Sequence, residues 1–340
     1  METSTAEGSE PIAHPLRAAL EDAFGIAVDR VERIHAGTAS DNFRVTARDG
    51  GRWFAKVHRS AGEAAAAARA VELTEFARRG GTPVPGLRRS VDRAVVARSH
   101  GLALSVWEYV DGETAETGLR GPRWHAVGAV LGRLHRHLAT HPSGRPVLAD
   151  PVQLIDPGAT AAGYDRLIEQ YRRPGATRDE FTRWALDALR QRRALLPEVV
   201  GLLRGLPPLT TQILHGDLAA PNVLLRGDEV AAVIDFQPPT RGFLAWEVAR
   251  IAGDPRTLAV PRWRAELPGL LDSYRAAHPT VPSADLDAVL AVGAAYTLAS
   301  TYPLSVLVDR RGRADHALQT YARQRHAAAL AMFEAATTRP

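Results

Sequence analysis

Hydrophobic and polar positions alternate in short runs along the first third of the chain. Such alternation is typical of strands that bury one face, whereas residues 62–79 are expected to form a helix. The strands are predicted around residues 31–34, 43–47, 53–58, 94–97 and 103–107. These elements indicate a small antiparallel β region with one helix.

The rest of the chain has mainly helical periodicity. Large apolar side chains recur at helical spacing and define a buried face at Trp124, Val127, Val130, Leu131, Leu134 and Leu138. His135 lies beside this stripe and is interpreted as a structural histidine. Residues 288–308 carry no charge over a length that could span a membrane, but they contain polar side chains and Pro303. We expect one buried helix here, broken near Pro303, and no membrane insertion.

A β-rich segment interrupts the helical part and reads HGDLAAPNVLLRGDEVAAVIDF from His215 to Phe236. The preceding residues 211–214 are expected to be extended, and 223–225 and 230–234 should form a hairpin around the turn RGDE. His215 is interpreted as a brace for the loop, bonded to backbone. The hairpin would carry the polar side chains at its ends on one rim.

Three polar residues of this segment have the spacing of a kinase catalytic site. Asp217 is followed five positions later by Asn222, and Asp235 precedes Phe236. Phosphoryl transfer from ATP needs a carboxylate that orients the hydroxyl and accepts its proton, together with oxygen ligands for Mg²⁺. Asp217 can be that base, and Asn222 and Asp235 can be the ligands.

The basic residues supply a second indication. Of the 42 lysines and arginines, Lys56 is the only lysine, and it lies in the predicted strand at 53–58. A compact ammonium group suits contact with the phosphates of ATP better than a planar guanidinium does. Alternation within the strand places Lys56 on the face opposite Ala55 and Val57.

Composition excludes several other classes of protein. With no cysteine, the chain has no disulfide, thiolate nucleophile or CxxC zinc site, and Lys56 lies outside any Gly-Lys-Ser/Thr phosphate-binding loop. The net charge of +4 comes from arginines scattered among acids, without the aromatic-interleaved basic stripe of single-strand binders. We therefore expect no nucleic-acid partner.

With these motifs the chain resembles the aminoglycoside phosphotransferase family, which shares its fold with choline kinases. The resemblance is carried, in order along the chain, by GTASDNF, Lys56, PVP at 83–85, VWEYVDG, LGRLHRHL, the HGD segment and RGFLAWEVARIA. The resemblance implies an α+β, two-lobed protein-kinase-like fold with a small antiparallel N-lobe and a larger, mainly helical C-lobe that carries the catalytic β-hairpin. We expect a disordered N-terminus at 1–11, an N-lobe at 12–107, a hinge at 108–112 and a C-lobe at 113–336.

The resemblance also implies roles at the nucleotide. Lys56 would contact the ATP phosphates, and the backbone of Glu108, Tyr109 and Val110 would contact adenine. The loop at 38–42 has no GxGxxG, so its backbone and the Ser40 hydroxyl are expected at the phosphates. The family often orients the lysine with a glutamate from the following helix; Glu72 is preferred here over Glu63.

The acceptor is expected to be a small-molecule hydroxyl, because a helix follows Asp235 too closely for a peptide platform. Residues 156–200 carry seven acids and eight arginines, which gives no bias toward a polycationic aminoglycoside. The alternatives are another antibiotic, a metabolite (homoserine, choline or an amino sugar), or a pseudokinase-like module that binds nucleotide without transfer. The protein is expected to be cytoplasmic, with ATP and Mg²⁺ as cofactors, and a monomer or homodimer.

Overall fold

The computed structural model describes residues 10–34, 40–115, 118–173, 179–260, 262–309 and 315–338. The chain divides into two compact units. Unit 1 consists of Met1–Glu113, His215–Asp217 and Val223–Pro239, and unit 2 of Thr114–Leu214, Leu218–Asn222 and Thr240–Pro340. The hairpin that sequence assigned to the C-lobe is therefore grouped with the β-rich unit.

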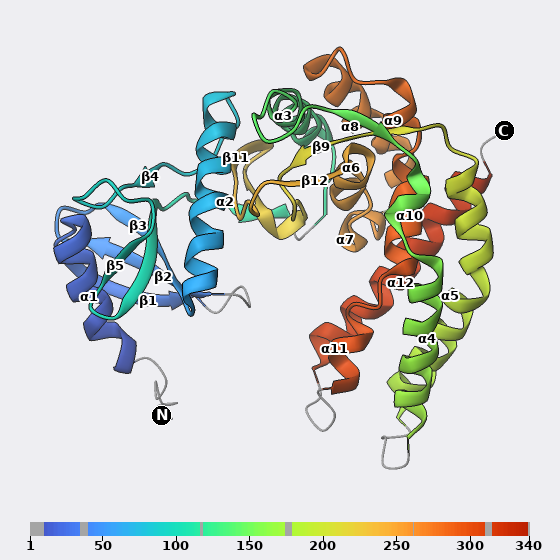
Figure 1. Ribbon diagram of the computed structural model, residues 1–340, viewed down its shortest axis with the longest axis horizontal. Helices are drawn as coiled ribbons and strands as arrows, with labels where there is room; N and C mark the ends of the chain where they lie inside the picture. Colours follow the sequence, from blue (N-terminus) through green and yellow to red (C-terminus); the bar gives the residue numbers. More distant parts are fainter. Residues whose placement is uncertain are drawn as a thin grey trace. The chain divides into compact units, whose positions relative to one another are not determined.

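An antiparallel sheet forms the centre of unit 1, with strand order β1-β2-β3-β6-β4 and β5 paired to β6 (Figure 1). The predicted strands are present, except that only Ala97 of 94–97 is in a strand. The elements of the main segment are α1 (Glu10–Phe24), β1 (Val28–Ile34), β2 (Asp41–Ala47), β3 (Arg52–His58), α2 (Ala61–Arg79), β4 (Leu87–Arg88), β5 (Ala97–Ser99), β6 (Leu102–Glu108) and β7 (Glu113–Thr114).

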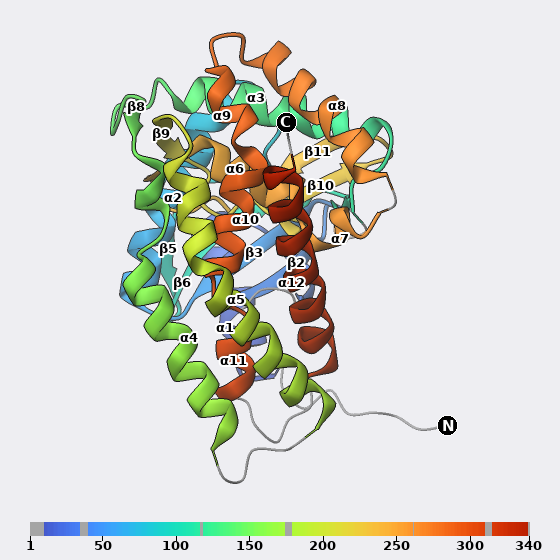
Figure 2. The ribbon, with the colours of Figure 1, turned by 90° about the vertical axis from the view of Figure 1, so that its right-hand side faces the viewer.

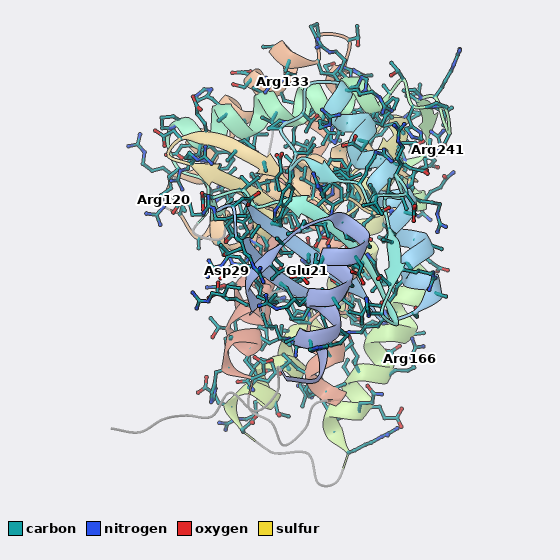
Figure 3. The ribbon with its side chains drawn as sticks, turned by 90° about the vertical axis from the view of Figure 1, so that its left-hand side faces the viewer. Glu21, Asp29, Arg120, Arg133, Arg166 and Arg241 are labelled. Carbon is teal, nitrogen blue, oxygen red and sulfur yellow. The ribbon has the colours of Figure 1, made fainter. Side chains whose placement is uncertain are left out.

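Helix α1 corrects the prediction of a single helix in this region. Glu10 and Pro11, assigned to a disordered N-terminus, lie within its bounds, and residues 1–9 are outside the described part of the chain. Two prolines conceal the helix in the sequence, but its apolar stripe is buried against the sheet at Leu16, Ala19, Leu20 and Phe24. The carboxylate of Glu21, labelled in Figure 3, accepts a hydrogen bond from Val28 N at 3.3 Å and ties α1 to β1.

The hairpin that the sequence predicts to be catalytic consists of β10 (Val223–Arg226) and β11 (Glu229–Val233). Gly227 has φ +62° in the turn between them, a conformation that glycine adopts without steric cost. Val233 N donates to Pro83 O at 2.8 Å, so the end of the hairpin is fixed to the PVP segment within the same unit. Both predicted strands of the hairpin are confirmed.

Unit 2 is mainly helical, with one small sheet of order β12-β9-β8. Figure 2 shows α4, α5, α10 and α12 running alongside one another. Its elements are α3 (Pro122–Leu138), β8 (Val147–Ala149), the 3-10 turn η2 (Pro151–Leu154), α4 (Pro157–Arg172), α5 (Glu180–Arg204), β9 (Leu209–Leu214), the 3-10 turn η3 (Ala220–Asn222), β12 (Thr240–Phe243), α6 (Leu244–Ala252), α7 (Pro255–Leu258), α8 (Trp263–Ala277), α9 (Ser283–Asp287), α10 (Val289–Ala299), α11 (Leu304–Asp309) and α12 (His316–Thr337).

The uncharged segment at 288–308 forms two helices of unit 2. Helix α10 ends at Ala299 and α11 begins at Leu304, directly after Pro303, as the sequence predicts. Among the described residues, Val289–Val308 is the one stretch long and apolar enough to cross a membrane, and 56% of it is buried inside the protein. Helix α10 packs against α5, α6 and α12, which is the environment of a core helix.

Candidate active site

The HGD loop is braced by His215, whose side chain is fully buried. Asp217 N donates to His215 Nδ1 at 3.2 Å, so the proton of the ring is on Nε2, which donates to Ile234 O at 2.8 Å. Gln237 N donates to His215 O at 2.9 Å, and the Phe236 ring lies 4.2 Å from the histidine ring. The predicted structural role of His215 is confirmed, because the ring joins the loop of Asp217 to the end of β11.

Glycine at position 216 allows this close approach. Gly216 has φ +91°, and a Cβ at this position would come within 2.8 Å of Gln237 Cβ. Asp235 is also in the left-handed region, at φ +68°, where aspartate is tolerated better than most residues. The backbone on both sides of the loop is therefore held in an uncommon conformation beside the two candidate aspartates.

Lys56 extends from β3 on the face of the sheet opposite the core of unit 1. Its neighbours Ala55 and Val57 are buried beneath α1 with Val45 and Leu104. Since side chains alternate along a strand, Lys56 leaves from the other face, where its side chain is 23% exposed. Burial and the charge of Lys56 lower the pKa of His58, which lies on the same face.

Lys56 forms an ion pair with Asp235, a residue 179 positions later in the chain. The Asp235 side chain is 41% exposed. Two residues singled out independently in the sequence thus meet within unit 1, and both charges keep access to solvent. Such a pair can exchange partners with a charged ligand at low cost, because exposed ion pairs contribute little to stability.

The two glutamates of α2 that were expected near Lys56 are Glu63 and Glu72. Glu63 N donates to the Ser60 side chain at 3.1 Å and Glu63 Oε2 accepts from Arg59 N at 2.7 Å, so this carboxylate stabilises the helix start. Glu72 is exposed, between the buried Val71 and Leu73. In the described residues Lys56 pairs with Asp235, and the expected role of Glu72 at the lysine stays a prediction.

The expected phosphate loop is described only in part, since residues 35–39, including Thr38, are outside the described residues. Ser40 Oγ donates to Asn42 Oδ1 at 2.9 Å. Asn42 is buried and pairs with Lys56 in the ladder between β2 and β3. Ser40 directly precedes β2, the strand that pairs with the strand of the lysine.

The hinge at Glu108, Tyr109 and Val110 follows β6. Glu108 N donates to Gly86 O at 2.8 Å and Tyr109 N donates to Arg52 O at 3.0 Å. The N–H groups of these two residues are thus already bonded within unit 1. An adenine contact at this segment would use Val110 N or the carbonyl groups.

Sequence reasoning missed the residues that hold the hinge. Arg52 forms a two-bond ion pair with Asp111 and lies 5.5 Å from the Tyr109 ring centre, with Arg44 at 5.8 Å from the same centre. The Arg52 guanidinium lowers the pKa of Asp111. Arg226 of β10 donates to Asp111 O at 3.1 Å. The VWEYVDG motif marked this segment, but its partners are distant in sequence and cannot be read from spacing.

The second half of the candidate catalytic loop, Leu218–Asn222, belongs to unit 2. Asn222 ends η3 and its N–H donates to Ala219 O at 2.9 Å. Arg250 of α6 donates from Nε to Leu218 O at 3.1 Å. Sequence reasoning also missed Arg250, which fixes the backbone immediately after Asp217.

Glu247 belongs to the RGFLAWEVARIA stretch and lies in α6. It is fully buried, and its Oε2 lies 3.0 Å from His135 Nε2. His135 Nδ1 is 2.8 Å from the hydroxyl of Tyr274, and the Gln212 side chain donates to His135 O at 2.9 Å. The prediction that His135 is a satisfied structural histidine is confirmed.

Comparisons with known proteins agree with this fold. The model of the phosphotransferase enzyme family matches residues 30–286, so the chain belongs to that family. Homoserine kinase from Pseudomonas aeruginosa is 28% identical over 209 residues, which cover 61% of this chain and 56% of the kinase. The matched region thus spans about half the length of this curated relative.

Solved structures show the same fold at low sequence identity. Spectinomycin phosphotransferase, solved with ADP and spectinomycin, has a TM-score of 0.67 at 14% identity, covering 94% of this chain and 98% of the other. An amicoumacin kinase, solved with AMP-PNP, Ca²⁺ and amicoumacin, has a TM-score of 0.60 at 16% identity, covering 95% and 94%. The fold is therefore the protein-kinase-like α+β fold of these enzymes.

Proposed function

We propose that the chain is an ATP- and Mg²⁺-dependent O-phosphotransferase that phosphorylates a hydroxyl group of a small molecule. The observation that carries the proposal is the ion pair of Lys56 and Asp235 beside the braced loop of Asp217. A kinase needs a cation for phosphate oxygens and an acid for metal in one place. The comparisons support a phosphotransferase, and ADP and AMP-PNP are bound by proteins of this fold.

The proposed reaction is a direct transfer. Asp217 orients the acceptor hydroxyl and accepts its proton while the acceptor oxygen forms a bond to the γ-phosphorus. The bond from that phosphorus to the bridging oxygen breaks and ADP leaves. Lys56 neutralises charge on the phosphate oxygens, and the loop geometry set by His215 positions Asp217.

Mg²⁺ fits the residues proposed to hold it. Asp235 and Asn222 offer oxygen donors, which magnesium prefers, and the Asp235 carboxylate is partly open to solvent. Within the described residues no group of three His, Cys, Asp or Glu side chains could hold a metal alone. Two protein ligands with the remainder from phosphate and water are usual for this ion, which shields phosphate charge when bound. The proposed use of ATP and Mg²⁺ supports a cytoplasmic location, where both are available.

Covalent transfer separates this proposal from a nucleotide-binding module without activity. The full chain is incubated with Mg²⁺ and ATP against aminoglycosides, peptide antibiotics, choline, homoserine and amino sugars, and each mixture is analysed by mass spectrometry. We expect one acceptor class to gain about 80 Da, the mass of a transferred phosphoryl group. Nucleotide binding with no phosphorylated product in any mixture would support the inactive module instead.

A further inference from the structure

A hollow in unit 2 lies at the catalytic loop. It is lined by Ala219 of that loop, by Trp246 and Arg250 of α6, by Asp254 at the start of α7, by Tyr296 of α10 and by Arg325 of α12. Its cavity volume is about 40 Å³, and the adjoining space that is open to solvent brings the total to about 390 Å³. Ala219 is two residues after Asp217 in the chain, so a molecule in this hollow contacts the loop that carries the proposed base.

The charged groups of the hollow are mainly positive. Arg250 and Arg325 line it, and Asp254 is the one acid among its lining residues. The Asp254 carboxylate is buried and already accepts from Arg256 N at 2.9 Å, where it caps α7. Burial raises the pKa of Asp254, while its hydrogen bonds with the backbone N–H groups of Arg256 and Ala220 and the charges of Arg256 and Arg325 act in the opposite direction.

Two buried hydrogen-bond donors in the walls of the hollow lack an acceptor. Four buried side-chain atoms of the described residues have no partner, and two of them, Trp246 Nε1 and Arg325 Nε, belong to residues that line this site. A buried N–H group without a partner is costly, and an oxygen acceptor removes the cost. Both groups donate only, so they match an acceptor-rich group and cannot bind an ammonium group.

The aromatic walls are also already covered by cations. The Arg250 guanidinium lies 5.3 Å from the Trp246 ring centre, and that of Arg325 lies 5.9 Å from the Tyr296 ring centre. An aromatic face attracts a ligand cation, but a guanidinium already on the face competes with it. The walls therefore give a polycation neither a free carboxylate nor an open aromatic face.

We propose that this hollow binds the acceptor through a carboxylate, and that the substrate class is hydroxylated carboxylic acids rather than polycationic aminoglycosides. The proposal rests on the phosphotransferase function proposed above. The carboxylate pairs with Arg325 and accepts from the two unpartnered donors, while a hydroxyl elsewhere on the molecule is the phosphorylated group. Arg250 is already bonded to Leu218 O and the Tyr296 hydroxyl, so it acts mainly by its charge.

The test compares acceptors that differ only at the acid. ADP release and ³¹P NMR are followed with homoserine and homoserinamide, serine and serinamide, glycerate and glyceramide, and with spectinomycin as a cationic probe. We expect at least one acid to be phosphorylated with kcat/KM at least about tenfold above its amide, since loss of a charged hydrogen bond in a buried site has that effect. Equal or better use of the amides or spectinomycin, or no phosphorylation of any acid, would overturn the proposal.

Variants locate the effect in the hollow. Arg325→Met should raise KM for the acid at least about tenfold with little change for the amide, and Arg325→Lys should recover part of the difference. Trp246→Phe removes one donor and keeps the ring, so it should raise KM for the acid by a smaller factor. Unchanged KM for the acid in Arg325→Met and Trp246→Phe, with normal melting temperatures, contradicts the proposal.

Arg323→Met is the matched control on the same helix. Arg323 pairs with Glu180 at 3.0 Å and is outside the hollow, so its loss should leave both acceptors unaffected. Phosphorylation of spectinomycin alone would overturn this inference and leave the phosphotransferase function standing. Failure of every acceptor, together with ATP hydrolysis that is unaffected by Asp217→Asn, would count against both.

Discussion

One acid–base pair in unit 1 and one in unit 2 differ in their exposure to solvent. In unit 1, Lys56 and Asp235 form an ion pair in which both side chains remain accessible, at 23% and 41% exposure. In unit 2, His135 and Glu247 are both fully enclosed. The side chains of an accessible pair can separate and bind a charged ligand. The side chains of an enclosed pair can form hydrogen bonds and ion pairs only with other groups of the protein.

The difference in exposure separates pairs that can bind a ligand from pairs that stabilise the fold. Removal of one partner from an accessible pair leaves the other solvated and should change ligand binding rather than folding. Removal of one partner from an enclosed pair leaves a buried polar group unsatisfied and should change folding. The same residue types, an acid and a base in contact, therefore have different consequences in the two units.

The largest effect in this comparison is expected at Lys56. Lys56→Met should lower kcat/KM for ATP by about 10²-fold or more, because phosphate charge loses its compact cation. Lys56→Arg should lose most of this activity although it keeps the positive charge, because the guanidinium group is planar and spreads its charge over a larger area than an ammonium group does. Initial rates at varied ATP measure both variants.

The stability of Lys56→Met tests whether its loss of activity comes from a folding defect. The free energy of unfolding of Lys56→Met, from urea denaturation, should lie within about 1 kcal/mol of the parent, as for an exposed pair. Unchanged ATP kinetics would remove Lys56 from the nucleotide site. A large loss of stability would show that the pair with Asp235 is structural, as in unit 2.

Glu247 provides the reverse case. Glu247→Ala should lower the free energy of unfolding by about 3 kcal/mol, because it leaves His135 and Tyr274 buried without their acid. Glu247→Gln, which keeps the shape and one acceptor, should cost clearly less. Urea unfolding followed by circular dichroism measures both, and equal stability of Glu247→Ala and the parent would contradict the enclosed network.

Buried histidine gives the smallest effect, and it depends on pH. Burial and the neighbouring Arg192 lower the pKa of His326 to about 4, from an ordinary 6.5. Arg192 Nε donates to His326 Nδ1 at 3.1 Å, so a proton on that nitrogen would oppose the buried guanidinium. Because the folded state has the lower pKa, unfolding takes up the proton first as pH falls below 6.5, and stability declines toward pH 4.

The size of this decline is expected to be roughly 2 kcal/mol between pH 7 and pH 4. His326→Gln should reduce it, since the amide oxygen accepts from Arg192 and does not titrate. His316→Gln, at an exposed position of the same helix, is the matched control and should leave the pH dependence as in the parent. Identical pH profiles for His326→Gln and the parent would exclude His326 as a source of acid sensitivity.

The sequence predicted those elements whose signals are local. The strands of the first sheet, the catalytic hairpin, the break before Pro303 and the bracing role of His215 all follow from alternation, turn residues or fixed spacing. Helix α1 was missed because Pro11 and Pro15 interrupt a pattern whose stability comes from burial against the sheet. Local propensity does not include that burial.

The candidate site was predictable to the extent that each residue belongs to a motif. The spacing from Asp217 to Asp235 and the single lysine identify four residues. The contact of Lys56 with Asp235 spans 179 positions and depends on the fold. Arg250 and Arg325 resemble the other arginines in sequence, and only the structure shows that they line one hollow with two unpartnered donors.

The most direct test of the central claim is the turnover of Asp217→Asn with an acceptor that the parent phosphorylates. Removal of a general base should lower kcat by at least about 10²-fold. Binding of Mg²⁺ and AMP-PNP, measured by calorimetry, should stay close to that of the parent, because Lys56 and Asp235 are intact. Turnover near the parent's with this variant would contradict the assignment of Asp217 and the kinase mechanism built on it.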